Sequence, residues 1–161
     1  MKAKVIVLYV TRTGHAKTVA EALASKLGAE AVEIKDLVDR RGILGYIKTG
    51  YQASTKKATP IEAPAVDLAS ASTVVLVQPI WASAVVPPFR TWLDAHGAEL
   101  KGKRVGLFVV CKGSDPTAVR RAYEGEFGPL TAFDGVRERD EEMLRNSVYD
   151  AFVDTLLART V

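Results

Sequence analysis

Three runs of apolar residues stand out along the chain, and none of them alternates regularly with polar residues. They are VIVLYV at 5–10, TVVLVQPI at 73–80 and RVGLFVVC at 104–111. Continuous apolar runs of this length, bounded by turn residues, are typical of parallel strands that are buried on both faces. Two weaker segments, 31–36 and 129–137, predict further strands, and we expect 31–36 at an edge of the sheet.

Amphipathic patterns typical of helices fill most of the stretches between these runs. In the first of them Val19, Leu23 and Leu27 recur at four-residue spacing, and Gly28 marks the expected end. Two further helices are predicted from side chains that would share an inward face: Phe89, Trp92, Leu93 and Leu100 after Pro87 and Pro88, and Leu144, Val148, Phe152 and Leu156 near the C-terminus. A helix between these two is expected to begin at Pro116, with Ser114 or Asp115 as its cap, and to stop at Gly128.

The alternation of strands and helices predicts an α/β protein with a parallel sheet. Right-handed crossovers leave few topologies for one small domain. We expect a doubly wound sandwich in which a five-stranded sheet of order 2-1-3-4-5 carries helices on both faces, with residues 1–161 as a single domain. For the irregular segment 39–64 we expect a short helix followed by a wandering connection.

Composition excludes several classes of protein. Hydrophobic residues make up 48% of the chain and charged residues 25%, which matches a folded globular protein. A single cysteine and the lack of a long uncharged apolar stretch argue against secretion and a membrane span, so we expect a cytoplasmic protein. The net charge is +3, but the clusters at 56–57 and 120–121 are not interleaved with aromatic residues, so nucleic-acid binding is not predicted.

The strand order points to the loops that follow the first, third and fourth strands, because ligands bind at the carboxyl ends of such sheets. These loops read TRTGHAK at 11–17, WASAVVPP at 81–88 and KGSDP at 112–116. The first would open a helix, whose N-terminus offers unpaired N–H groups to an anion. Its hydroxyls, its glycine and the basic side chains of His15 and Lys17 suit one terminal phosphate without a metal. The alternative is that Thr11, Thr13 and Gly14 only form the turn.

Other chemistries find less support. Neither the dinucleotide pattern G-x-G-x-x-G nor the triphosphate pattern G-x-x-x-x-G-K-[ST] is present. Two histidines cannot build a histidine-rich metal site, and we expect His96 to be a partly buried packing residue. Cys111 lacks the loop spacing of a thiol phosphatase. It is either a small buried side chain or a residue at the rim of a ligand site.

Two of these loops together resemble those of the flavodoxin family. The second loop matches the pattern P-[VI]-W-x-x-x-x-x-P-P through Pro79, Ile80 and Trp81 and then Pro87 and Pro88, and TRTG in the first loop matches T-x-T-G. The likeness extends from residue 4 to about residue 112. It implies a flavodoxin-like fold and non-covalent FMN, with the phosphate in the first loop and the ring between the second and third.

The resemblance implies electron transfer or flavin-dependent reduction, with a redox partner protein or a small-molecule electron acceptor; a homodimer is left open. No catalytic residue and no metal ligand is assigned. The predicted cofactor-binding residues are Thr11, Arg12, Thr13, Gly14, His15, Ala16, Pro79, Ile80, Trp81, Ala82, Ser83, Cys111, Lys112 and Gly113.

Three positions depart from the family pattern. Ala16 stands where a hydroxyl residue is usual, and Val77 and Gln78 stand where glycine and a hydroxyl residue are usual. A hydroxyl at 16 would add one hydrogen bond to a phosphate, and the Val77 side chain is expected to crowd the ring. These departures motivate the alternative hypothesis, a flavodoxin-fold binding or scaffold protein that has lost FMN.

Overall fold

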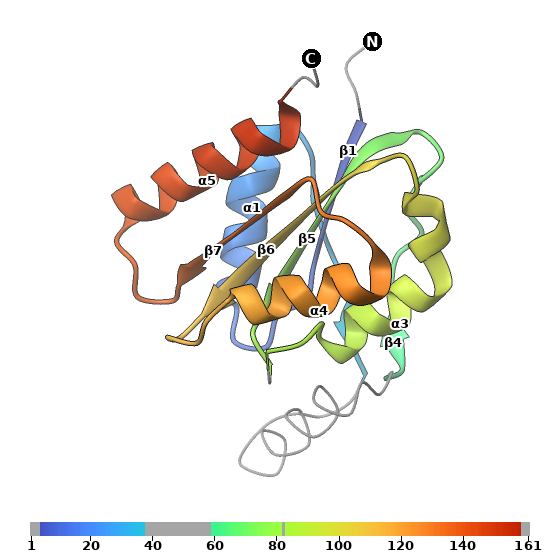
Figure 1. The fold of residues 1–161 in the computed structure, drawn as a ribbon, viewed down its shortest axis with the longest axis horizontal. Helices are drawn as coiled ribbons and strands as arrows, with labels where there is room; N and C mark the ends of the chain where they lie inside the picture. Colours follow the sequence, from blue (N-terminus) through green and yellow to red (C-terminus); the bar gives the residue numbers. More distant parts are fainter. Residues whose placement is uncertain (1–3, 38–58, 82, 159–161) are drawn as a thin grey trace.

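The computed structural model describes residues 4–37, 59–81 and 83–158. Five parallel strands form one sheet in the order β2-β1-β5-β6-β7, as Figure 1 shows. Numbered within this sheet alone, that order is 2-1-3-4-5, so the predicted topology is confirmed. The strands are β1 (Lys4–Tyr9), β2 (Ala31–Glu33), β5 (Ala71–Pro79), β6 (Arg104–Cys111) and β7 (Ala132–Arg137).

Two helices cover each face of the sheet (Figure 1). One face packs against α1 (His15–Leu27) and α5 (Glu142–Leu157), and the other against α3 (Pro87–His96) and α4 (Thr117–Phe127). Alternate strand residues supply the two cores: Val75 and Val77 point to the first face, and Val74 and Leu76 to the second. This division explains why the apolar runs are continuous, because both faces of each central strand are buried.

Helix ends follow the local signals in the sequence. Gly28 closes α1 with φ 65, and its N–H donates to carbonyls of the last turn. Pro87 and Pro88 open α3 at positions where a helix needs no N–H. Pro116 is the N-cap of α4, and the Asp115 carboxylate accepts from the N–H of Thr117 at 2.9 Å.

Several element predictions need correction. The predicted strand at 31–36 is divided: β2 ends at Glu33, and β3 (Lys35–Asp36) pairs antiparallel with β4 (Ile61–Glu62) in a separate ribbon. Leu100 is buried, but it belongs to a 3₁₀ turn, η1 (Gly97–Leu100), and not to α3. The predicted fifth strand starts at Ala132 rather than at 129.

The inward face of α5 also differs from the prediction. Leu144 is 52% exposed, whereas Tyr149 is 3% exposed and packs in the core with Phe152 and Leu156. A tyrosine was not counted as apolar in the four-residue spacing, and its ring nevertheless packs 5.5 Å from the ring of Phe108. The short helix expected within 39–64 falls mostly outside the described residues.

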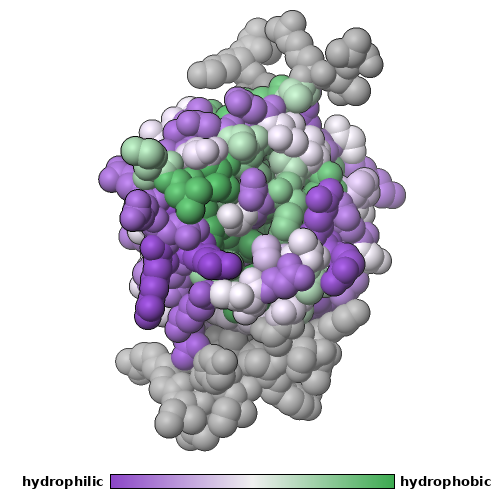
Figure 2. Space-filling model, turned by 60° about the vertical axis from the view of Figure 1, so that its left-hand side comes forward, coloured by the Kyte–Doolittle hydropathy of each residue, from purple (hydrophilic) through white to green (hydrophobic). Residues whose placement is uncertain are grey.

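In the described part of the chain, the edge strand β7 pairs only with β6. Figure 2, turned so that this side of the molecule comes forward, shows a hydrophobic area in its upper half bordered by hydrophilic side chains. Asp134 and Arg137 lie on this short strand, and the Arg120 guanidinium lies 5.8 Å from the ring of Phe133. Charges on a short edge strand disfavour the addition of another strand.

The carboxyl ends of β1, β5 and β6 lie side by side at the lower edge of the sheet in Figure 1. The loops that follow these strands therefore meet at one end of the molecule. Within the described ranges, no helix is both long enough and apolar enough to cross a membrane.

Candidate functional site at the carboxyl ends of the strands

A cleft of about 440 Å³ opens where these three loops meet. The residues that line it are Arg12, Thr13, Pro79, Ile80, Trp81, Val110, Cys111, Lys112, Ser114 and Glu138. Seven of the predicted cofactor-binding residues are among them, drawn from all three loops. The remaining predicted residues lie outside this lining set, except Ala82, which lies outside the described residues.

The first loop forms a turn that leads into the first N–H groups of α1. The hydroxyl oxygen of Thr11 accepts from the N–H of Gly14 at 2.9 Å, and Gly14 adopts φ 94 directly before the helix. The first helical hydrogen bond runs from Thr18 to the carbonyl of Gly14. Within the described chain, the N–H groups of the three residues between them, 15–17, donate to no backbone oxygen. Thr11 and Gly14 therefore make the turn, and the N–H groups of 15–17 remain available as donors within the described chain.

Ala16 contributes only its backbone to this end of the helix. Its side chain is 2% exposed and packs in the core with Val19 and Ala20. A hydroxyl at this position would stand at the boundary of that core rather than in the cleft. The departure at Ala16 therefore leaves the N–H donors of the turn intact.

The second loop provides one wall of the cleft. Ile80 donates its N–H to the carbonyl of Val110 at 3.2 Å, which joins this loop to the end of β6. Trp81 lines the cleft but is only 8% exposed, because most of its ring packs in the core on the α3 side. Ser83, at φ 52, is in the left-handed region that side chains usually avoid, and Ala84 donates to the carbonyl of Trp81 at 3.4 Å. The wall is thus largely buried and ends in a tight turn.

Val77 does not crowd this cleft. Its side chain is fully buried on the α1 and α5 face of the sheet, and it is absent from the lining. The sequence-based expectation for Val77 is therefore wrong, because a strand residue at this position points away from the loop that follows it. Gln78 is also fully buried and lies outside the lining.

The end of β6 and the third loop bring Cys111 and Lys112 to the cleft. Cys111 is 7% exposed, and its Sγ lies 3.7 Å from the carbonyl oxygen of Val136. Burial raises the pKa of the Cys111 thiol. Charged groups near the end of β7 have smaller effects: Arg137 lowers this pKa, and Asp140 and Glu138 raise it. Cys111 therefore remains a neutral thiol at the rim of the cleft at neutral pH. Lys112 is exposed and adds a positive charge.

Three lining residues, Val110, Ser114 and Glu138, are missing from the set predicted from the sequence. Ser114 was considered only as a helix cap, but the N-cap of α4 is Pro116, without a side-chain cap, and Ser114 lines the cleft. Glu138 arrives from the end of β7, where its N–H donates to the carbonyl of Cys111 at 2.8 Å. Its carboxylate lies 3.7 Å from Nε2 of His15. No motif marks the end of the last strand as part of a site, so only the register of β7 against β6 reveals this residue.

The charges of the cleft are mixed. Arg12, Lys112 and Glu138 all line it, with His15 beside the glutamate. In the described parts of the chain, no group of three histidine, cysteine or acidic residues is arranged to hold a metal ion. The arrangement therefore offers backbone donors and a few basic side chains to an anion, and apolar walls beside them.

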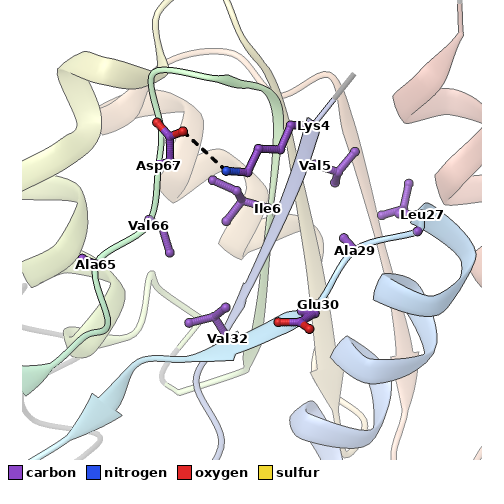
Figure 3. A pocket seen from close by; sticks show the side chains of 11 residues that line it. Lys4, Val5, Ile6, Leu27, Ala29, Glu30, Val32, Ala65, Val66 and Asp67 are labelled. Atoms are coloured by element: carbon purple, nitrogen blue, oxygen red, sulfur yellow. Dashed lines mark ion pairs between the residues drawn. The ribbon is translucent and has the colours of Figure 1, made fainter. Parts of the chain in front are cut away.

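A second cavity, of about 540 Å³, lies at the opposite end of the sheet (Figure 3). Figure 3 shows Ile6, Val32 and Val66 on its walls and a Lys4–Asp67 ion pair of 3.6 Å at its edge. It forms beside β1 because β2 begins opposite Val7 and leaves the first residues of β1 without a strand on that side. None of the predicted cofactor-binding residues lies there.

Solved structures show which proteins share this fold. A flavoprotein from Lactobacillus acidophilus, solved in complex with FMN, superposes with a TM-score of 0.75 at 19% identity over 94% of this chain and 99% of its own. A flavodoxin, WrbA-like protein from Agrobacterium tumefaciens has a TM-score of 0.64 at 14% identity, covering 96% and 95%. A flavodoxin from the domain Archaea has a TM-score of 0.60 at 13% identity, covering 94% and 95%.

No protein-family model and no curated protein sequence matches this chain. At the low identities of the structural matches, the likeness establishes the fold alone. That fold is flavodoxin-like, as the two loop motifs predicted.

Proposed function

We propose that this protein binds FMN non-covalently in the cleft at the carboxyl ends of its strands and acts in electron transfer or in flavin-dependent reduction. The observation that carries the proposal is the convergence of three predicted loops on one cleft, next to a helix N-terminus with free N–H groups. FMN itself would supply the redox chemistry, since flavins accept electrons singly or in pairs.

The first loop suits the phosphate. Three N–H groups at 15–17 have no backbone acceptor in the described chain, and the positive end of the α1 dipole lies at the same place. Thr13 and Arg12 line the adjoining part of the cleft, where they would add a hydroxyl donor and a positive charge. Backbone donors of this kind discriminate an anion from a neutral group without needing a metal.

The second and third loops suit a flat ring. Ile80 and Trp81 form one wall, and Val110 and Cys111 form the floor beside it. These side chains are apolar or neutral, so they exclude water from one side of a bound ring, and Trp81 offers the edge of an aromatic face. A lone Lys112 at the rim would favour a negative charge on the ring after reduction.

The first experiment is the visible spectrum of the purified protein, followed by calorimetric titration of the colourless protein with FMN. The proposal expects either a flavin spectrum that survives gel filtration or heat on titration to one FMN per chain. A colourless protein that gives no heat with FMN would refute it. Electron transfer is tested next, by photoreducing the bound FMN and following its reoxidation by an added acceptor.

Two observations favour the alternative, a scaffold or binding protein of the same fold without FMN. Trp81 exposes only 8% of its surface, so little of its ring is available for stacking, and Glu138 places a negative charge in the cleft. Under this alternative the visible spectrum and the titration are both blank, while the protein remains folded by circular dichroism.

A further inference from the structure

Gln78 forms three hydrogen bonds with the loop that carries Trp81. It is the last but one residue of β5 and is completely buried. Its Nε2 donates to the carbonyl of Pro79 and to that of Ala84, both at 3.0 Å. Its Oε1 accepts from the N–H of Val86 at 3.3 Å. Both ends of the side-chain amide are therefore used, and every partner belongs to 79–86.

Among the described residues of this loop, few backbone hydrogen bonds help to fix its path. Pro79, Pro87 and Pro88 have no N–H, and the backbone hydrogen bonds donated by Ile80 and Ala84 are 3.2 and 3.4 Å long. A buried backbone group without a partner is costly, so the loop conformation depends on a side chain that both donates and accepts. An amide side chain has both functions, whereas the isosteric methionine has neither and an ionised glutamate only accepts.

We propose that Gln78 is a positioning residue for the cleft: it ties Pro79, Ala84 and Val86 together. In this way it holds Ile80 and Trp81 in the cleft wall without touching the ligand. The side chain points to the α3 side of the sheet, below the loop, and is absent from the cleft lining. The ring of Trp81 can bury most of its surface because both ends of its loop are attached to the same amide. The effect of Gln78 on FMN binding rests on the proposed function, but the first test of the inference needs no flavin.

The first arm uses flavin-free protein labelled with 5-fluorotryptophan. The chain has two tryptophans, so fluorine NMR gives one signal from Trp81 in the cleft wall and one from Trp92 in the core of α3. In Gln78→Met and Gln78→Glu we expect the Trp81 signal to acquire a larger H₂O/D₂O isotope shift while the Trp92 signal stays in place. Leu76→Met is the matched control, because it puts methionine on the same strand and face but leaves the three hydrogen bonds intact.

The second arm compares FMN with riboflavin. Loss of Gln78 should weaken both ligands by the same factor, about tenfold, because a disordered wall affects the ring and not the phosphate. An unchanged Trp81 signal in both Gln78 variants would overturn the inference, as would equal shifts at Trp92 or a selective loss of FMN binding. If the wild-type protein binds neither ligand, the proposed function fails, while the fluorine signals still decide whether Gln78 holds the loop.

Discussion

Replacing Gly14 by alanine tests how the first loop recognises its ligand. Gly14 adopts φ 94 and ψ −12, and no atom beyond its chain neighbours lies within 4 Å of the position a Cβ would take. The added methyl group therefore meets open space, and the cost comes from the backbone alone. A left-handed conformation costs a residue with a side chain about 1–2 kcal/mol relative to glycine.

The variant has two ways to accommodate this cost. If the turn keeps its shape, the free energy of unfolding falls by about 1–2 kcal/mol and FMN affinity changes little. If the turn relaxes, the N–H groups at 15–17 shift away from the phosphate. Each hydrogen bond to a charged group contributes about 1.5–3 kcal/mol, so losing one weakens FMN roughly 10- to 150-fold. We expect the second result, because α1 packs firmly on the sheet while the turn before it is partly exposed.

The assay is calorimetric titration with FMN and with riboflavin, together with urea unfolding of the flavin-free protein. Riboflavin has no phosphate, so its affinity should remain almost unchanged. Gly97→Ala is the control, since Gly97 lies outside the three loops of the cleft, has no positive φ and also has open space around it. Gly14→Asn should recover part of the loss, because asparagine tolerates positive φ. Equal weakening of both ligands in Gly14→Ala, or an equal effect of Gly97→Ala, would refute the reasoning.

Three further predictions concern charge, packing and pH. Glu138→Gln removes a half-buried negative charge from the cleft and should tighten FMN by up to about fivefold without affecting riboflavin, as calorimetry can check. Gly106→Ala puts a methyl group 2.6 Å from the ring of Phe152, so thermal unfolding should report a loss of about 1–3 kcal/mol, whereas Gly97→Ala meets no atom and should have little effect. Burial raises the pKa of Tyr123 from 10.0 to about 12, so between these values the folded state keeps a proton that the unfolded chain loses. The free energy of unfolding should therefore fall as the pH rises from 10 towards 12. In urea unfolding, Tyr123→Phe should make that fall less steep.

The order of the main sheet could be predicted because its central strands are buried on both sides. The continuous apolar runs that became β1, β5 and β6 are short and bounded by turn residues, which favours buried strands over buried helices, and crossover handedness then limits the topology. The weak segment at 31–36 was less informative. Lys35 and Asp36 leave the sheet to pair with 61–62, and a two-residue antiparallel ribbon has no pattern that a single sequence could reveal.

The candidate site was predictable where it depends on loop position and not where it depends on side-chain direction. Trp81 and Cys111 could be predicted because each stands at the carboxyl end of an apolar run in the sequence. Both line the cleft. The directions of Ala16 and Val77 depend on the exact phase of helix and strand, and both side chains point into the core. Glu138 depends on how far β7 extends beside β6, which no local signal determines.

The binding of FMN at the carboxyl ends of the strands is tested most directly by an NMR titration of the backbone amides of ¹⁵N-labelled protein with FMN. The account predicts that the largest shifts occur at 15–17, at Ile80 and Trp81, and at Cys111 and Lys112, and that they saturate at one FMN per chain. Riboflavin should reproduce the shifts of the second and third loops but not those at 15–17. Shifts confined to the cavity around Val5, Val32 and Val66 at the other end of the sheet, or no shifts at all, would contradict the account.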